Sequence, residues 1–237
     1  GEVRSCKEAG QPGYDSDACW FFRSSGALGM MFAFRTLINR DRFNFCGDNG
    51  ELCLEAAELA WKDIQSAADE AYDRSDTCGF TSFVGYEWTA SVGQGANLHR
   101  NVVFRNAEVP ALPVSWVETK SPWKLWDQLE SGCRLGVPGC EVLAIPHNSN
   151  LSAGTMFQTV NDEGEPLTAP DARKRVRNEP LVEIMQHKGS SECYFDPLTS
   201  ADEYCGFEQL PARSFSDNTP PQPNDGFLRE VLKREPY

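Results

Sequence analysis

The sequence predicts an α/β fold, because short apolar runs rich in β-prone residues alternate with segments of helical periodicity. This alternation indicates a sheet whose strands are at least partly parallel. The chain has 237 residues, of which 40% are hydrophobic and 24% are charged, as in an ordinary soluble globular protein. That length suffices for one sizeable core, so we expect residues 1–237 to form a single α/β domain.

The N-terminal part of the chain combines a loop with two helices. Residues 1–25 carry Gly, Pro, Asp and Ser with little periodicity, which predicts a loop pinned by Cys6 and Cys19. A buried helix is expected over about residues 26–38. The segment 51–72 is the most strongly helical of the chain. Its apolar residues recur at three- and four-residue steps: Ala57, Trp61, Ile64, Ala68 and Ala71.

The rest of the chain supplies the strands. Four strands are expected, over residues 80–87, 98–104, 141–146 and 181–186. Ser121 and Pro122 begin a helix that runs through Leu129, with Ser as the N-cap and Pro at the first helical position. A basic patch at residues 173–177 is compatible with a short helix, and a last helix is expected over residues 225–234.

Composition and missing motifs exclude several classes of protein. The net charge of −13 argues against nucleic acid or an anionic membrane surface as a partner. The longest apolar stretch, residues 26–37, is too short to span a bilayer. The sequence also lacks a Gly-x-Ser-x-Gly elbow, a P-loop, a His-Glu-x-x-His motif and a Gly-x-Gly-x-x-Gly motif. Nucleophilic-serine, nucleotide-hydrolysing and zincin-type enzymes are therefore disfavoured.

Nine cysteines are more than a typical cytosolic enzyme carries, and most of them form close pairs. The pairs are Cys6/Cys19, Cys46/Cys53, Cys133/Cys140 and Cys193/Cys205. Such local loops suit disulfides in an oxidising compartment, whereas zinc binding, the rival interpretation, lacks any Cys-x-x-Cys spacing. We therefore expect a periplasmic or secreted protein with Cys78 as a buried free thiol. The chain begins at Gly1 without a signal peptide, so we expect that an export signal was removed or that the chain is part of a longer protein.

Histidine and glutamate side chains at strand ends are the main indication of function. Glu87 ends one apolar strand, and His147 directly follows another. Such groups suit a metal-dependent hydrolase, in which a carboxylate bridges cations or acts as a general base. If the strand that follows His99 is an antiparallel partner of the strand that ends in Glu87, His99 returns to the same rim. Two ligands of one ion lie roughly 3–4 Å apart, and we expect this separation for Glu87 and His147. The alternative for Glu87 is an exposed carboxylate or one paired with Arg100.

Charged residues beside the histidines are candidates for substrate binding. Arg100 and Lys188 each directly follow a histidine, and each could neutralise an anionic group. Glu183 and His187 share one face if their segment is a strand, so either could reach a metal ion. For His99 and His187, a hydrogen-bonded structural role is the alternative to metal ligation.

The segments around these residues resemble the domain-of-unknown-function family 3604, which is similar to the polymerase-and-histidinol-phosphatase (PHP) superfamily. They are residues 85–89, 97–106, 144–152, 179–184, 186–189 and 191–192. The resemblance implies a partial or distorted (β/α) barrel of the PHP type, with long disulfide-pinned loops and a metal cluster at its C-terminal rim. By motif, Glu87 would be the bridging carboxylate and His147 a metal ligand, while His99 and His187 map onto the same site.

The resemblance also implies a function. Superfamily members carry a His-x-His strand and an Asp-x-His strand that this chain lacks, so we expect it to be the central, incomplete part of a larger barrel. The first hypothesis is a metal-dependent hydrolase for phosphate or other small anionic esters, with zinc or manganese as the cofactor. Its expected metal ligands are Glu87, His99, His147 and His187, and its expected catalytic and substrate-binding residues are Glu87, Arg100 and Lys188. The second hypothesis is a non-catalytic, disulfide-stapled extracellular module that binds a ligand or partner.

Overall fold

The chain folds into two compact units, each assembled from several segments of the sequence. The computed structural model describes residues 1–29, 41–92, 96–147, 149–186, 189–190, 192–193, 202–206 and 227–229. The first unit comprises residues 1–86, 104–120 and 128–141, and the second comprises residues 87–103, 121–127 and 142–237. None of the described helices is long and apolar enough to cross a membrane.

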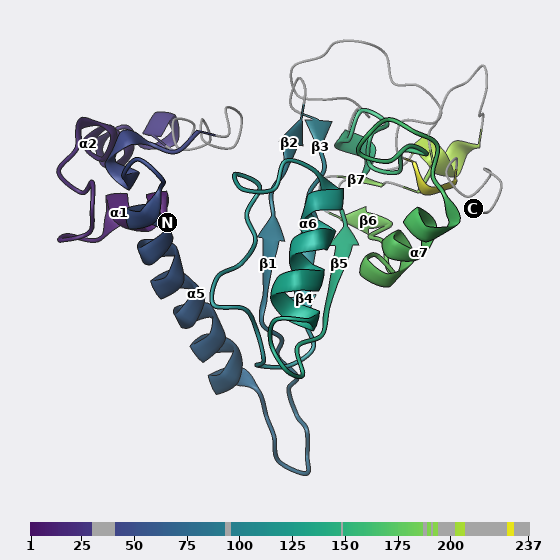
Figure 1. Ribbon diagram of the computed structural model, residues 1–237, viewed down its shortest axis with the longest axis horizontal. Coiled ribbons are helices and arrows are strands. Elements are labelled where there is room, and N and C mark those ends of the chain that lie inside the picture. Colours follow the sequence, from purple (N-terminus) through teal and green to yellow (C-terminus); the bar gives the residue numbers. More distant parts are fainter. Residues whose placement is uncertain are drawn as a thin grey trace. The chain divides into compact units, whose positions relative to one another are not determined.

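Two short helices open the first unit, where the sequence predicted a loop (Figure 1). They are α1, Glu2–Lys7, and α2, Asp17–Ser24. Ser16 caps α2, because its hydroxyl accepts a hydrogen bond from the backbone N–H of Cys19 at 3.2 Å. The prediction of a loop over residues 1–25 is therefore wrong. Helices this short contain too few turns for a clear periodicity, and they depend on tertiary contacts such as the Cys6–Cys19 disulfide.

Helix α5 spans Glu51–Ala71 and confirms the most strongly predicted helix. It begins after Gly50, whose φ of 77° lies in the left-handed region that glycine adopts without strain. The short 3₁₀ helix η1, Asn44–Cys46, precedes it. A disulfide between Cys46 and Cys53 joins η1 to the first turn of α5, so the start of the helix is fixed covalently.

An aromatic cluster around Trp61 fixes the buried face of α5. Trp61 is 1% exposed, and its ring centroid lies 5.8 Å from those of Tyr86 and Phe104. Its indole Nε1 donates a hydrogen bond to the carbonyl oxygen of Pro110 at 2.8 Å. Ile64, which the apolar periodicity placed on the buried face, is instead 41% exposed. The helix is therefore anchored at one large side chain rather than along a continuous apolar stripe.

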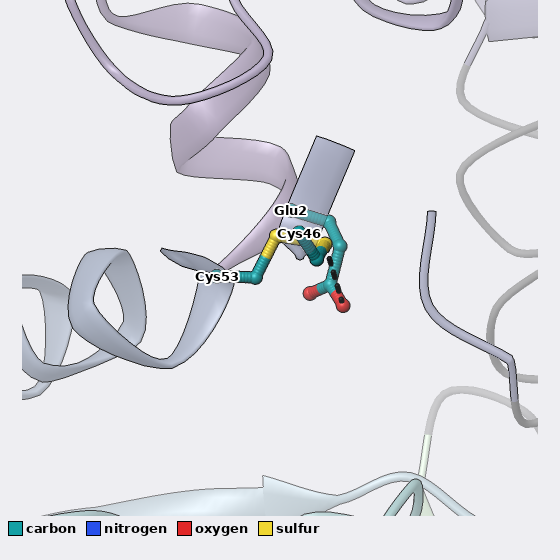
Figure 2. A group of neighbouring side chains, drawn as sticks. All are labelled: Glu2, Cys46 and Cys53. Carbon is teal, nitrogen blue, oxygen red and sulfur yellow. Dashed lines mark hydrogen bonds between the residues drawn. A yellow bond between two sulfur atoms is a disulfide. The ribbon is translucent and has the colours of Figure 1, made fainter. Parts of the chain in front are cut away.

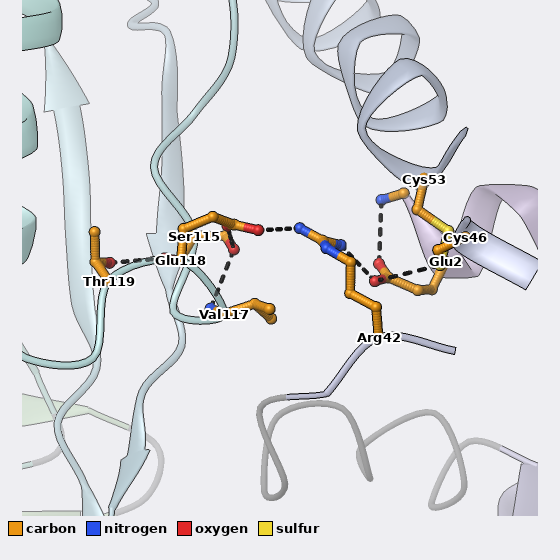
Figure 3. A network of polar contacts seen from close by, with 9 residues as sticks. Glu2, Arg42, Cys46, Cys53, Ser115, Val117, Glu118 and Thr119 are labelled. Atoms are coloured by element: carbon orange, nitrogen blue, oxygen red, sulfur yellow. Dashed lines mark hydrogen bonds and ion pairs between the residues drawn. A yellow bond between two sulfur atoms is a disulfide. The ribbon is translucent and has the colours of Figure 1, made fainter. Parts of the chain in front are cut away.

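A polar network links the first helix of this unit to a later segment of the same unit (Figure 3). Arg42 joins two carboxylates: its Nη1 lies 2.5 Å from Glu2 Oε1, and its Nη2 pairs with Glu118. Glu118 also accepts a hydrogen bond from the hydroxyl of Ser115. The carbonyl of Ser115 in turn accepts a hydrogen bond from the hydroxyl of Thr119 at 2.7 Å. Arg42 thus neutralises both glutamates within one chain of contacts.

Three strands form the main sheet, in the order β1, β4 and β5: Gly85–Trp88, Arg100–Phe104 and Val142–Pro146. The backbone hydrogen bonds that flank β1 and β4 run from Leu98 N to Ala90 O and from Phe104 N to Val84 O. Residue numbers on one strand rise as those on the other fall, so β1 and β4 are antiparallel.

The second pair in this sheet is also antiparallel. The N–H of His147 donates to the carbonyl of His99 at 3.2 Å, and the N–H of Arg105 donates to that of Glu141 at 2.9 Å. Strands β1 and β5 therefore run in one direction, with β4 opposed between them. The sequence indicated partly parallel pairing, but the neighbouring strands within the described residues are antiparallel. Closure into a (β/α) barrel stays a prediction.

Helix α6, Pro122–Leu129, confirms the helix expected after Ser121. The hydroxyl of Ser121 accepts a hydrogen bond from the N–H of Lys124 at 3.2 Å, which is the predicted N-cap. Leu125 and Trp126 are completely buried, so one face of this helix packs into the protein interior. A π-helical turn, Glu130–Arg134, follows it.

The basic patch lies on helix α7, Ala169–Asn178. Thr168 and Asp171 form a capping box, because each side chain accepts a hydrogen bond from the other's backbone N–H. Lys174 forms an ion pair with Asp127, and the guanidinium of Arg175 lies 5.8 Å from the centre of the Trp126 ring. Part of the basic patch therefore holds α7 against α6.

The remaining strands are shorter than the sequence predicted. Strand β1 begins at Gly85 rather than at residue 80, and the expected strand 181–186 is reduced to β6. The small elements are β2 (Ser91–Val92), β3 (Ala96–Asn97), β6 (Met185–Gln186), β7 (Gly189–Ser190), η3 (Ser149–Leu151) and η4 (Glu203–Gly206). Strands β2 and β3 pair antiparallel, as do β6 and β7.

Most of the expected helices 26–38 and 225–234 lies outside the described residues.

All four expected disulfides are confirmed: Cys6–Cys19, Cys46–Cys53, Cys133–Cys140 and Cys193–Cys205. Short closed loops of this kind each stabilise a protein by roughly 2–3 kcal/mol. Four of them indicate a protein that folds in an oxidising compartment. Cys78 is free, as expected, but it is exposed rather than buried.

Thiol labelling under non-reducing conditions is expected to modify Cys78 alone. Because this thiol is exposed, it should react in the native protein, without denaturant. The other cysteines should react only after reduction. Mass spectrometry of the alkylated protein checks both statements, with Cys78→Ser as the unlabelled control. Labelling of the paired cysteines before reduction would contradict the disulfide assignment and the oxidising compartment with it.

Candidate metal centre

The antiparallel course of β4 brings three strand ends to one edge of the sheet. Glu87 lies near the end of β1, His147 directly follows β5, and His99 directly precedes β4. The hydrogen bond from Leu98 to Ala90 places His99 opposite Thr89, the residue that follows β1. Residues two apart on a strand share a face, so Glu87 and His99 point to the same side. The sequence left the direction of this strand open, and the antiparallel alternative, which returns His99 to the rim of Glu87, is the one observed.

The side chains of these residues converge on one small volume. Glu87 Oε1 lies 2.9 Å from His99 Nδ1 and 3.7 Å from His147 Nε2. The three potential ligand atoms all lie within 4.8 Å of one another. The expected approach of Glu87 and His147 is therefore confirmed. Both imidazoles are largely buried, whereas the side chain of Glu87 is 42% exposed, so the carboxylate faces solvent and the imidazoles form the inner wall.

These separations fit a single divalent cation. With metal–ligand bonds of about 2.0–2.2 Å, two ligands of one ion lie roughly 3–4 Å apart. His99 Nδ1 makes no well-aligned hydrogen bond with any described residue, although Glu87 Oε1 is close. Two imidazoles and one carboxylate are ligands that zinc and manganese both accept, and three protein ligands leave a coordination position for water.

The surroundings of Glu87 favour its ionised form. The neighbouring imidazoles of His147 and His99 hold the pKa of the Glu87 carboxyl well below its usual range, and burial only partly opposes them. The hydroxyl of Thr89 also donates a hydrogen bond to Oε1 at 2.9 Å. Glu87 is consequently a carboxylate at neutral pH, as a cation ligand must be. Thr89 was not predicted, although its position two residues after Glu87 was a usable signal, because residues two apart in an extended segment share a face.

A second carboxylate approaches the other edge of the His147 ring. Glu183 Oε2 lies 3.6 Å from His147 Nδ1, and the side chain of Glu183 is 28% exposed. The sequence had offered Glu183 as a direct metal ligand. Among the described residues it does not join Glu87, His99 and His147 in the cluster of mutually close ligand atoms.

Arg100 does not face the site as expected. Its side chain is fully buried, and its Nε donates to Glu179 Oε1 at 2.8 Å. Its Nη1 donates to the carbonyl of Leu98 at 2.6 Å. Successive residues on a strand point to opposite faces, so Arg100 points away from the face that carries His99. Its surroundings make Arg100 a structural cation rather than a substrate-binding one. The alternative in which Glu87 pairs with Arg100 is also wrong, because Glu87 lies beside the two histidines instead.

Two expected site residues, His187 and Lys188, lie outside the described residues. Their roles as a metal ligand and an anion-binding cation stay predictions.

A second group of potential ligands lies in the first unit (Figure 2). Glu2, Cys46 and Cys53 are close enough to share an ion. The two sulfur atoms are joined in a disulfide, however, and a metal ligand must be a thiolate. Glu2 is also engaged by the Arg42 guanidinium, which would repel a cation. This group is therefore a structural contact.

Comparison with known proteins shows the family to which the chain is similar. Residues 24–235 match the model of a protein family described as "Protein of unknown function (DUF3604)". The matched segment includes every residue of the candidate metal centre. No curated protein and no solved structure matches the chain.

Proposed function

The chain belongs to the DUF3604 family, whose function is unknown, and from this premise we propose that it is a metal-dependent hydrolase of phosphate or other small anionic esters. The observation that supports the proposal is the convergence of Glu87, His99 and His147 from three strand ends. Nothing in the pairing of the strands requires these polar side chains to meet. A cation held between them explains why they do.

Each residue of the site has its own role in this proposal. His99 and His147 offer ring nitrogens from the buried wall, and Glu87 adds a negative charge on the solvent side. Thr89 fixes the orientation of the carboxylate through its hydrogen bond to Oε1. A bound divalent ion, zinc or manganese, would supply an activated water and polarise an ester oxygen.

A relationship to the PHP superfamily, as the sequence segments imply, extends the proposal. Glu87 would then bridge two cations, and His187 would be a further ligand. Lys188 is the candidate for binding the anionic group of the substrate, since Arg100 is engaged with Glu179. The four disulfides suit an exported protein, and we place it in the periplasm or outside the cell.

Metal analysis and a hydrolysis screen test the proposal. The protein is analysed for bound metal, titrated with Zn²⁺ and Mn²⁺, and assayed on a panel of phosphate esters. Glu87→Gln and His147→Gln are each expected to weaken Zn²⁺ binding at least about tenfold, because loss of an outer partner of a ligand alone costs roughly 10–100-fold. Activity on the best ester should fall in parallel.

Glu163→Gln is the matched control, because Glu163 is an exposed glutamate with no part in the site. It should bind metal like the wild type. Absence of both metal binding and hydrolysis would defeat the proposal. So would wild-type metal affinity in both site variants.

The alternative is a ligand-binding module without catalysis. A cavity of about 330 Å³ in the first unit supports it, since the lining combines apolar, aromatic and charged groups, including Tyr72, Arg74, Phe83 and Arg105. If Glu87→Gln and His147→Gln leave the binding of a ligand intact, this second function applies to the chain.

A further inference from the structure

We propose that Glu183 positions His147 for metal binding, by accepting a hydrogen bond from Nδ1–H so that the lone pair of Nε2 faces the ion. This inference rests on the proposed function. It assigns Glu183 a role different from that of a metal ligand. Histidines that bind metal commonly donate their second ring N–H to a carboxylate, which fixes both the tautomer and the orientation of the ring.

The backbone fixes Glu183 next to the end of β5. The N–H of Glu183 donates to the carbonyl of Pro146 at 3.1 Å. Pro146 is the last residue of β5 and directly precedes His147. This bond attaches the segment that carries Glu183 to the residue before His147. The position of the Glu183 side chain along the His147 ring is thereby fixed.

The side-chain geometry matches the role. Glu183 Oε2 is buried and has no hydrogen-bond donor among the described residues. A buried carboxylate oxygen without a donor is costly, and His147 Nδ1 lies 3.6 Å away. A small rotation of either side chain brings this distance into the range of about 2.7–3.2 Å for a hydrogen bond. A proton on Nδ1 satisfies the carboxylate and leaves a lone pair on Nε2, the nitrogen that lies 3.7 Å from Glu87.

The same geometry argues against direct ligation by Glu183. The two nitrogens of an imidazole lie on different edges of the ring, and a carboxylate at Nδ1 is separated by the ring from an ion at Nε2. Glu183 accordingly lies outside the group formed by Glu87, His99 and His147.

The tautomer of His147 can be measured directly. The chain has only three histidines, so ¹⁵N-histidine labelling and long-range ¹H–¹⁵N spectra resolve each ring, with assignment by single His→Gln variants. In the metal-free wild type, His147 is expected to carry its proton on Nδ1. In Glu183→Ala this preference should be lost, and the affinity for Zn²⁺, measured by chelator competition, should fall by roughly 10–100-fold. Glu183→Gln keeps a hydrogen-bond acceptor, so it should restore part of the Nδ1 preference and part of the Zn²⁺ affinity.

The controls separate this inference from the proposed function. Glu163→Ala should change neither the tautomer nor the affinity. If Glu183→Ala does not fold, Glu183→Met, which keeps the length of the side chain, replaces it. An unchanged His147 tautomer together with unchanged Zn²⁺ affinity would overturn the inference. If the wild type binds no Zn²⁺, the proposed function fails, and the tautomer in the metal-free protein still decides whether Glu183 orients the ring.

Discussion

Arg100→Leu is expected to lower the free energy of unfolding by about 3–5 kcal/mol, because it leaves a buried carboxylate without its counter-charge. The side chains of Arg100 and Glu179 are 0% and 3% exposed. After the substitution, the donor that Glu179 would keep among the described residues is the indole Nε1 of Trp126, 3.2 Å from the same oxygen. The carbonyls of Leu98 and Met156 would also lose their guanidinium donors. Each of these losses acts in the interior, where water cannot replace the missing partner.

Urea unfolding measures this cost. The double variant Arg100→Leu/Glu179→Leu is expected to be more stable than Arg100→Leu, since it removes the uncompensated charge as well. Lys62→Ala is the control, because Lys62 pairs with Glu58 on the surface, where such pairs contribute about 0–1 kcal/mol. A cost for Arg100→Leu no larger than that of Lys62→Ala would show that the buried pair is not formed.

Trp61→Ala is expected to cost about 3–5 kcal/mol, as large aromatic truncations in cores do. The substitution removes the centre of the cluster with Tyr86 and Phe104 and leaves a cavity under α5. It also deprives the carbonyl of Pro110 of its indole donor. Trp61→Phe keeps an aromatic ring but not the N–H, so its cost should be smaller.

Trp20→Ala is the matched control, because Trp20 is 64% exposed. Exposed substitutions usually change stability by no more than about 0.5 kcal/mol. Thermal or urea unfolding of the three variants gives the comparison. If Trp61→Ala and Trp20→Ala have the same small effect, α5 does not depend on the aromatic cluster.

Local patterns in the sequence were enough to predict the elements with strong local signals. Helix α5 has three-residue and four-residue periodicity over many turns, and α6 has Ser121 and Pro122 at its start. The disulfides could also be predicted, since each joins cysteines that are close in the sequence. Strand β5 was recognisable as a continuous apolar run. In each case the information lies within one segment.

Long-range pairing could not be predicted in the same way. Arg100 looks like an exposed, functional arginine, and only the arrival of Glu179 from a distant part of the chain makes it a buried ion pair. The contact of Glu183 with His147 likewise depends on the bond from Glu183 to Pro146. The position of His99 depended on the direction of β4, which the sequence left open. The sequence therefore named the three residues that converge, Glu87, His99 and His147, but the contacts that support them required the structure.

The order of the cysteines has a consequence for how the protein matures. Each disulfide joins neighbouring cysteines in chain order, at sequence separations of 7 to 13, and Cys78 stands alone between the second and third pairs. As the chain emerges into an oxidising compartment from its N-terminus, each cysteine meets its native partner before the next pair arrives. When Cys78 emerges, all four preceding cysteines can already be cross-linked. We therefore expect simple stepwise oxidation during emergence to yield the native set without a disulfide isomerase.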